Sequence, residues 1–419
     1  MALITLTARE LLVRLPALNV ASLFILSLAL SLSGCDQARK EKYEPFRMQG
    51  SAFGTTYSII AYSQAKNASS NHRKLKSDIE QLLLDFDASL STYHDDTEIS
   101  RFNRADTEAW IPVSKRLYEA VKTANAISRI TVGRYDITIG AVTQLYGFGG
   151  GREPKRAPNE RELVDAKELV DYRALEYRAS SASYELRKEK AVILDVSSIS
   201  KGQAVDELAA LIEERGIKSY LVEIGGEMRI GAAKPLSGPP AGSQRSQTTV
   251  SGSIVVPGTW TVGVEEPRHE RRRLARVLAL TNQSIATSGD YRNYYLLADD
   301  KTNKLGLYPH TINPQSGKPA YLTQKKAGQV LSITVLHERC MVADAWATAL
   351  KLFELDDAVA IANAYDLDAL FIYMKDYDSD HLKKRVSEQK AAIFAASDSS
   401  HYGYITTGTI DQFLITRNK

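Results

Sequence analysis

The polar segment from Asp195 to Asp206 is the stretch of this sequence best suited to chemistry. Its letters, Asp-Val-Ser-Ser-Ile-Ser-Lys-Gly-Gln-Ala-Val-Asp, combine small hydroxyl residues with Lys201 and a glycine. The apolar run 191–194 before it is typical of a strand, and the apolar spacing over 204–212 predicts a helix that ends near Gly216. Free N–H groups at such a helix start attract anions, above all phosphates. An ordinary strand-to-helix turn with a serine cap explains the same letters equally well.

A second candidate site is the pair Asp344 and Thr348, which stand four residues apart in a segment with helical apolar spacing. Residues at i and i+4 face the same side of a helix. A carboxylate and a hydroxyl placed in this way can share a hard cation such as Mg²⁺, which prefers oxygen ligands and keeps positions open for phosphate. For the pair alone, a solvated aspartate and a threonine bonded to the backbone are the favoured alternative.

A third candidate is His310, which precedes a turn built by Asn313-Pro314 and Ser316-Gly317. A histidine held on a rigid turn is a suitable base near neutral pH. A histidine with a purely structural role is the alternative. The segment 287–292 also combines small hydroxyl residues with a glycine and a charged pair, and a simple β-turn explains it as well.

The first 35 residues have the order of an export signal. Two arginines precede an apolar run from Ala17 to Leu32, and Leu32-Ser-Gly-Cys35 follows. This order is typical of a signal peptide rather than of a folded element. Leu-Ser-Gly-Cys resembles the bacterial lipobox, so we expect removal of residues 1–34 and a lipid on Cys35 that anchors the protein to a membrane without spanning it. A plain signal peptide or a signal anchor is the alternative.

The residue after the predicted lipid anchor is Asp36. An aspartate at this place resembles the signal that retains lipoproteins in the inner membrane of enteric bacteria. We therefore expect the protein at the periplasmic face of the inner membrane, with residues 35–44 as a tether.

Composition narrows the possible functions. The chain has 419 residues and a formal net charge of +3, and this near balance gives no support for a nucleic-acid partner. Of its two cysteines one is the predicted anchor, so we expect no disulfide. The seven histidines are scattered, and no Cys/His cluster of the metal-binding kind occurs.

The rest of the chain is long enough for one large domain or two lobes. A shift to Ser, Pro, Gly and Thr marks residues 232–258 as an insertion, and the role of 376–419 is open. The apolar patterns predict strands at 53–62, 219–231 with a Gly-Gly turn, 260–264 and 330–335, and helices at 75–84, 114–129, 160–169 and 340–350.

Five of these motifs, in their order, resemble those of the ApbE family, whose members are FAD:protein FMN transferases. No single motif is specific, but the ordered series is. The resemblance covers roughly residues 45–375, and earlier segments such as Gly54–Tyr57, Ser91–Tyr93, Glu98–Arg101 and Tyr146–Phe148 fit it too. The five motifs are Asp195-x-x-x-Ile-x-Lys-Gly-x-Ala-Val-Asp206, Glu223-Ile-Gly-Gly-Glu227, Ile285-Ala-Thr-Ser-Gly-Asp-Tyr291, His310-x-Ile-Asn-Pro-x-Ser-Gly317 and Ala343-Asp-Ala-x-Ala-Thr-Ala349.

The resemblance implies an α+β fold in which one large domain, 45–375, holds mixed or antiparallel sheets, packed helices and an FAD cleft between two lobes, with 376–419 as an extension of that domain. It implies FAD as the substrate and Mg²⁺ as the cofactor. His310 matches the histidine that deprotonates the acceptor hydroxyl and also lies at the FAD. The implied Mg²⁺ ligands are Asp344, Thr348 and the backbone carbonyl of Ser198, and the implied FAD-lining residues are Tyr93, Arg134, Tyr135, Asp136, Asp195 and Lys201.

This chain departs from the family pattern at a few positions. Ser197, Ser198 and Ser200 stand where glycine or alanine is frequent, and Asn313 stands where aspartate is frequent. None of these changes removes an implied ligand, and we expect the serines to affect only the shape of the pocket.

The family resemblance also implies the partners. The acceptors are exported or membrane-bound redox subunits, such as those of the sodium-pumping NADH:quinone oxidoreductase (Nqr) or the Rnf complex, which offer a Thr or Ser. Two alternatives stay open. A Mg²⁺-dependent FAD pyrophosphatase uses water in place of the protein hydroxyl, and a non-enzymatic flavin-binding lipoprotein needs a pocket but no metal.

Overall fold

A computed structural model describes most of the chain beyond the predicted signal and tether. The predictions for residues 1–34, for Cys35, for 36–42 and for most of the 232–258 insertion lie outside the described residues. The described residues are 43–64, 68–150, 154, 156–235, 248–250, 253–255, 258–267, 273–289, 294–298, 305–319, 327–375, 392–394 and 402–415.

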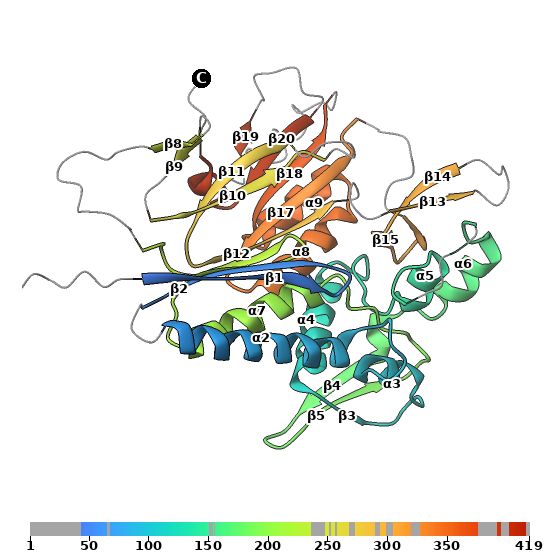
Figure 1. Cartoon of the computed structure of the whole chain (residues 1–419). Coiled ribbons are helices and arrows are strands. Elements are labelled where there is room, and N and C mark those ends of the chain that lie inside the picture. The colour runs from blue at the N-terminus through green and yellow to red at the C-terminus, as the bar shows by residue number, and fades with distance from the viewer. Residues whose placement is uncertain are drawn as a thin grey trace, which may run out of the picture. The chain divides into compact units, whose positions relative to one another are not determined.

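An antiparallel sheet of nine strands forms the centre of this part of the chain (Figure 1). Its first two strands are joined by a tight turn in which Phe53 and Gly54 both have positive φ, 53° and 72°. The order across the sheet is β1 (Tyr43–Ala52), β2 (Thr55–Gln64), β6 (Ser219–Ile224), β7 (Glu227–Ile230), β12 (Gln283–Gly289), β17 (Val330–His337), β18 (Asp368–Met374), β20 (Tyr402–Thr407) and β19 (Ala392–Phe394).

The two faces of the sheet are covered differently, as β18 illustrates. Ala369, Phe371 and Tyr373 point into the main core, whereas Leu370 and Ile372 point into a second apolar cluster on the opposite face. This alternation follows from the two-residue period of a strand. The main core is closed by the helices α2 (Ala68–Leu90), α4 (Lys115–Ile130), α7 (Ser200–Glu214), α8 (Cys340–Lys351) and α9 (Leu355–Ala364).

The opposite face of the sheet is covered by a two-stranded hairpin, β10 (Trp260–Glu265) and β11 (Leu274–Leu280), which lies in front of β17 and β18 in Figure 1. Trp260 is the largest side chain of this second cluster, and its indole N–H donates to the carbonyl of Ala232 at 3.0 Å. The short helix η2 (Ile410–Phe413) adds Ile410 to the same cluster.

Smaller elements complete the described part of the chain. A third apolar cluster joins Tyr146 and Phe148 to Tyr308. Its elements are α5 (Gly140–Leu145), α6 (Glu160–Lys167), β13 (Tyr294–Ala298), β14 (Leu305–Pro309) and β15 (Ile312–Asn313), the last paired with β16 (Lys318–Pro319). The others are α3 (Glu98–Arg104), the sheet of β3 (Ile111–Val113), β5 (Tyr184–Lys188) and β4 (Leu175–Ala179), the short helix η1 (Tyr172–Ala174), and the pair β8 (Thr248–Val250) and β9 (Ser253–Val255).

The predicted α+β class, with antiparallel sheets and packed helices in one domain, is confirmed. Ser114 caps α4 by accepting the N–H of Leu117, and Gly225 and Gly226 form the turn between β6 and β7 with positive φ. The C-terminal segment contributes β20, which pairs with β18 in the central sheet. In the described part of the chain, no helix has the length and apolar character needed to cross a membrane. The FAD cleft between two lobes stays a prediction.

Two predictions at the level of elements need correction. The tether ends before Tyr43, because Tyr43 and Glu44 already pair with β2. The run 191–194 is extended but is no regular strand, since Ile193 makes only an isolated bridge to Ile139. On its other edge, the side chain of Asn103 takes the place of a neighbouring strand.

Candidate functional site

The extended run before Asp195 is held from both sides. On one side the N–H of Gly140 donates to the carbonyl of Ile193 at 2.9 Å, and the N–H of Asp195 donates to that of Ile137 at 2.8 Å. On the other side the Asn103 amide takes the place of a neighbouring strand. It accepts the N–H of Leu194 at 2.8 Å and donates to the carbonyl of Leu194 at 3.0 Å. Asp195 is thereby fixed at the end of this run.

Both carboxylate oxygens of Asp195 are engaged within the protein. One accepts the hydroxyl of Thr143 at 2.8 Å, and the other accepts the N–H of Ser197 at 3.0 Å. Gly149 packs directly against the carboxylate, since a Cβ at this position would lie 2.6 Å from Asp195 Oδ2. The glycine-rich segment after α5 therefore approaches Asp195 closely, and its absent side chain is what permits the approach.

Helices α7 and α8 cap each other at their N-terminal ends. The N–H of Gly202 in α7 donates to Asp344 Oδ2 of α8 at 3.0 Å. In return the N–H groups of Cys340 and Met341, at the start of α8, donate to the two oxygens of Asp206 in α7 at 2.8 and 3.0 Å. Gly202 lies so close to the Cys340 carbonyl that no side chain would fit there. This reciprocal capping fixes Asp344 at the start of α7.

Ser198 lies just before the start of α7. Gly202 is the third residue of α7, so its N–H has no acceptor within the helix. This N–H donates to Asp344, which brings the carboxylate to the first turn of α7. The Ser198 hydroxyl is 3.0 Å from the phenol oxygen of the buried Tyr135. Ser198 and the Asp344 carboxylate thus both lie beside the first turn of α7, and the metal site that they would form with Thr348 stays a prediction.

The donor set suits Mg²⁺ in chemical type. Among the residues that the structure describes, no three His, Cys, Asp or Glu side chains come together as a metal cluster. The predicted set consists instead of one carboxylate, the half-buried hydroxyl of Thr348 one turn further along α8, and one carbonyl. All three are oxygen donors, and Mg²⁺ typically binds few protein ligands and fills its other positions with phosphate oxygens and water.

Lys201 lies between two buried carboxylates. Its Nζ is 3.9 Å from Asp344 Oδ2, 3.6 Å from Glu227 Oε1 and 3.4 Å from the carbonyl of Ser197. Burial opposes the charge of Lys201, but Asp344 and Glu227 together hold its pKa above the ordinary value. Burial also raises the pKa of Asp344, against the Lys201 charge and the Gly202 N–H.

Glu227 is a site residue that the sequence reasoning did not single out. It is buried, and its Oε2 has no hydrogen-bond partner. Burial raises the pKa of Glu227 to about 8, with Lys201 acting against this shift and Asp344 adding to it. A divalent cation at Asp344 would lower the pKa of Glu227 again, because nearby positive charge favours the ionised form. Its place in the motif Glu223-Ile-Gly-Gly-Glu227 was the available signal.

The residues predicted to line FAD differ in exposure. Tyr93 is 71% exposed, and burial of its remaining part and the nearby Asp195 and Tyr295 raise its pKa. Tyr135 is buried behind Ser198, and burial raises its pKa. Of the two aromatic rings, Tyr93 therefore offers the free surface.

Arg134 and Asp136 bind parts of the protein itself. The Arg134 guanidinium lies 4.7 Å above the Phe353 ring and donates to the Leu352 carbonyl at 3.4 Å. The Asp136 carboxylate accepts the N–H and hydroxyl of Thr138 at 2.8 and 2.7 Å and the N–H of Tyr172 at 2.9 Å. Burial raises the pKa of Asp136 to about 6, against these hydrogen bonds. These contacts support the backbone around Tyr135, and the roles of both residues at FAD stay predictions.

His310 follows β14 and is half-buried. Its ring stands edge-on to Phe148 at a centroid distance of 6.4 Å. Phe148 precedes Gly149, which packs against Asp195. His310 is therefore linked to Asp195 through contacts with residues 148 and 149. Its role as a base stays a prediction.

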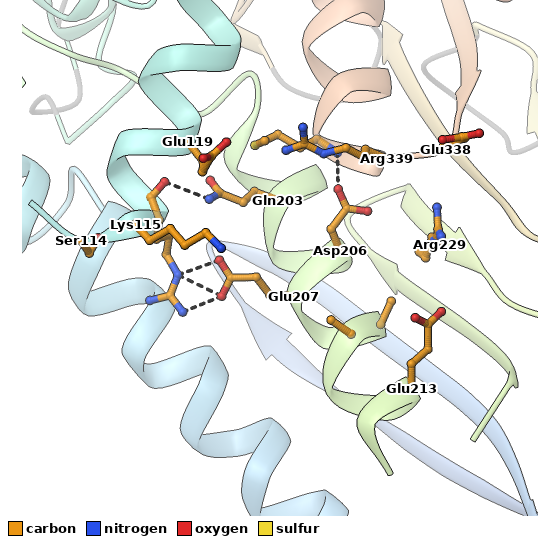
Figure 2. Close-up of a pocket in the computed structure, with 14 residues that line it drawn as sticks. Ser114, Lys115, Glu119, Gln203, Asp206, Glu207, Glu213, Arg229, Glu338 and Arg339 are labelled. Carbon is orange, nitrogen blue, oxygen red and sulfur yellow. Dashed lines mark hydrogen bonds and ion pairs between the residues drawn. The ribbon is translucent and has the colours of Figure 1, made fainter. Parts of the chain in front are cut away.

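A cavity of about 650 Å³ lies beside α7 but holds none of the predicted site residues (Figure 2). Gln203, Asp206 and Ala210 line it from the face of α7 that helical periodicity directs away from Lys201. Within its charged wall, Arg116 binds Glu207 through two nitrogens at 2.6 to 3.1 Å. The cavity is therefore separate from the cluster around Asp344.

The sequence and the fold of this chain are both similar to those of known proteins. The ApbE family matches residues 53–371. The FAD:protein FMN transferase of Vibrio cholerae is 30% identical over 371 residues, which cover 87% of this chain and 99% of that protein. The enzyme of the same name from Haemophilus influenzae is 29% identical and covers 85% of this chain and 93% of its own.

Solved structures agree with this match. The flavin transferase ApbE from Vibrio cholerae superposes with a TM-score of 0.67 at 27% identity, over 89% of this chain and all of that one. The flavinyl transferase ApbE of Pseudomonas stutzeri shares the fold with a TM-score of 0.65 at 24% identity, over 89% of this chain and 97% of its own. This chain belongs to the ApbE family.

Proposed function

We propose that this protein transfers the FMN part of FAD to a serine or threonine hydroxyl of an acceptor protein, with AMP as the leaving group and Mg²⁺ as the required ion. Its membership of the ApbE family and its FAD:protein FMN transferase relatives support the reaction. The observation that carries the proposal is the hydrogen bond from Gly202 to Asp344, which places a carboxylate of α8 beside the first turn of α7, close to Ser198 in sequence.

Asp344, Thr348 and the Ser198 carbonyl would hold the Mg²⁺ ion. When bound, the ion supplies Lewis-acid polarisation of the phosphoryl oxygens and neutralises part of the diphosphate charge. Lys201 adds a positive charge beside the same place, 3.9 Å from Asp344. Tyr93 offers an exposed ring on which a flavin or adenine can stack.

The transfer itself exchanges one P–O bond for another. The oxygen of the acceptor hydroxyl forms a bond to the phosphorus on the FMN side, and His310 accepts the hydroxyl proton. The bond from this phosphorus to the bridging oxygen breaks, and AMP leaves with the electron pair of that bond. Positioning and charge stabilisation dominate such phosphoryl transfers, so the base is the smaller contribution.

The acceptor and the location are part of the proposal. We expect exported or membrane-bound redox subunits, such as those of the Nqr or Rnf complexes, as acceptors. Lipidation at Cys35 would hold the enzyme at the periplasmic face of the inner membrane. Replacing Cys35 by serine should move the protein from the membrane fraction to the soluble periplasmic fraction, and an unchanged membrane fraction would contradict a lipid anchor at this residue.

Incubation of the protein with FAD, Mg²⁺ and a purified candidate acceptor tests the reaction. We expect a fluorescent acceptor band on a denaturing gel, with the mass of FMN added to a hydroxyl residue. Asp344→Asn should lower the rate by about 100-fold or more, because loss of metal stabilisation is worth several kcal/mol. Asp357→Asn, at an exposed position of α9, is the control and should keep the wild-type rate.

The same assay separates the alternatives. Release of FMN and AMP without a labelled acceptor would identify a pyrophosphatase. Tight FAD binding that EDTA does not change, with no turnover, would identify a flavin-binding lipoprotein.

A further inference from the structure

Glu227 is a buried carboxylic acid beside Lys201, which in turn faces the proposed metal ligand Asp344. Glu227 is the first residue of β7, directly after the Gly225–Gly226 turn, and only 4% of it is exposed. Its Oε1 faces the Lys201 ammonium at 3.6 Å, and its Oε2 is buried without a hydrogen-bond partner. Burying a carboxylate oxygen without a hydrogen-bond partner costs free energy of folding. Such a group in a native protein therefore indicates a functional role.

Lys201 and a metal ion compete for the same carboxylate. The Lys201 ammonium lies 3.9 Å from Asp344 Oδ2, the oxygen that also accepts the Gly202 N–H. If Lys201 paired with Asp344 alone, a cation approaching Asp344 would have to displace the ammonium or lie beside it, and like charges repel strongly in a buried site.

Glu227 offers the ammonium a second partner on the other side. The two carboxylates come from different elements, β7 and α8, and Lys201 comes from α7, so backbone contacts fix the three groups independently of each other. The separations of 3.6 and 3.9 Å are longer than a tight charged hydrogen bond, so the ammonium is shared rather than bound to one carboxylate.

We propose that Glu227 is a positioning residue that holds the Lys201 ammonium away from Asp344, so that Asp344 keeps an oxygen for Mg²⁺. The proposal rests on the proposed metal site. With the ion present, two carboxylates face one divalent cation and one ammonium, and the net positive charge that remains suits the diphosphate of FAD. Without Glu227, Lys201 would pair with Asp344 and weaken metal binding.

Binding of Mn²⁺ to the purified protein tests this without any turnover. The probe is Mn²⁺ alone, whose free concentration is followed by electron paramagnetic resonance, with Mg²⁺ as competitor. Glu227→Gln should weaken Mn²⁺ binding by about 10- to 100-fold, the range found when residues that orient metal ligands are changed. The control is Glu223→Gln in the same hairpin. Glu223 accepts the N–H of Gly226 at 2.8 Å, and the oxygen of a glutamine can accept the same N–H, so this variant should keep the wild-type Mn²⁺ affinity.

The decisive comparison repeats the change in a Lys201→Met background. If Glu227 acts mainly through Lys201, then Glu227→Gln should weaken Mn²⁺ binding much less once the ammonium is gone, because only the direct effect of the Glu227 charge on the cation remains. A direct metal ligand or a purely structural residue would weaken binding equally in both backgrounds, and either result would overturn the proposal.

Thermal melting shows whether each variant is folded. If Glu227→Gln has no cooperative melting transition, Glu227→Asp is measured in its place. This variant keeps the negative charge, so its Mn²⁺ affinity should stay within about 3-fold of the wild-type value. Weakening by Glu227→Asp as large as that expected for Glu227→Gln would overturn the proposal. Failure of the wild type to label an acceptor refutes the proposed function, whereas unchanged Mn²⁺ affinity in Glu227→Gln, or no Mn²⁺ binding by the wild type, refutes this inference.

Discussion

At the scale of single residues, the site depends on where backbone N–H groups donate. The Gly202 N–H lies in the first turn of α7, has no acceptor within the helix, and donates to Asp344, which orients this carboxylate. Bonds from an N–H to a carboxylate are stronger than those to a neutral carbonyl, so this contact is stable. Asp206 acts in the same way, since it accepts two N–H groups at the start of α8.

His310→Ala is expected to leave FAD binding within a few-fold of wild type and to slow FMN transfer by about 10²- to 10⁴-fold, the usual contribution of a general base. FAD affinity is measured by quenching of flavin fluorescence, and transfer by single-turnover labelling of the acceptor. A parallel loss of affinity and rate would mean that His310 binds FAD and is not the base.

Asp136 should make the protein less stable as the pH rises from about 4 to 6. Burial raises the pKa of the folded-state carboxyl to about 6, above the value near 3.9 of an unfolded chain. The folded state therefore holds the proton more tightly, and its advantage is complete below pH 4 and lost as the pH passes 6. The loss is on the order of 2 kcal/mol.

Urea unfolding of the wild type and of Asp136→Asn at pH 4 and pH 7 measures this effect. The asparagine keeps an oxygen for Thr138 but turns an N–H toward that of Tyr172, so it should cost about 1 kcal/mol relative to the protonated aspartic acid. The wild type should therefore be the more stable protein at pH 4 and the less stable one at pH 7, because only the wild type loses stability as the pH rises. The same stability difference at both pH values would show that Asp136 has an ordinary pKa.

At the scale of elements, the crossing of α7 and α8 determines how the residues of the proposed metal site are arranged. Each helix supplies the carboxylate that caps the other, and Gly202 allows the two backbones to touch at the Cys340 carbonyl. The run 191–194 is held by Asn103 of α3 in a comparable way, with a side chain replacing a strand neighbour. Packing between elements, more than any one helix or strand, positions the site.

Gly202→Ala should therefore damage stability and metal binding together. The added Cβ forces α7 and α8 apart, which costs about 1–3 kcal/mol as overpacking does in other cores. It also lengthens the bond from the Gly202 N–H to Asp344. We expect a lower free energy of unfolding in urea and weaker Mn²⁺ binding.

The matched control is Glu214→Ala, an exposed change in the same helix, which should stay within about 0.5 kcal/mol of wild type. Wild-type stability and Mn²⁺ affinity in Gly202→Ala would show that the two helices tolerate a wider crossing. The close approach of Gly202 to the Cys340 carbonyl would then not be needed for metal binding.

At the scale of the whole molecule, the described chain folds around one sheet that its first and last strands both join. Strand β20 pairs with β18 along its whole length and buries Tyr402, Tyr404 and Ile405. Without it, β18 would become an edge with an apolar face and unpaired N–H and C=O groups, which promotes aggregation.

Truncation after Lys375 should thus yield protein that is insoluble or lacks a cooperative thermal transition. Size-exclusion chromatography and thermal melting followed by circular dichroism measure this. A chain shortened only beyond Ile415 is the control and should melt like the full chain. A soluble, cooperative protein without β20 would show that the sheet is complete at β18.

The sequence by itself determined the class of this protein and most of its local structure. Apolar spacing and the Gly-Gly pair were enough to predict α4, the turn at Gly225–Gly226 and the core of α8, since each depends on residues close together in the chain. Motif order was enough to indicate the ApbE family, which the match over residues 53–371 confirms.

Only the tertiary structure decided which groups meet at the site. The hydrogen bond from Gly202 to Asp344 joins residues that are far apart in the sequence. No local pattern predicts that Glu227, Lys201 and Asp344 lie close together. Nor does one predict that the Asn103 side chain binds the backbone of Leu194 in place of a strand. These contacts arise because burying apolar faces of the sheet and helices brings distant polar groups together, and each buried group must then find a partner. The placement of these partners determines the geometry of the site.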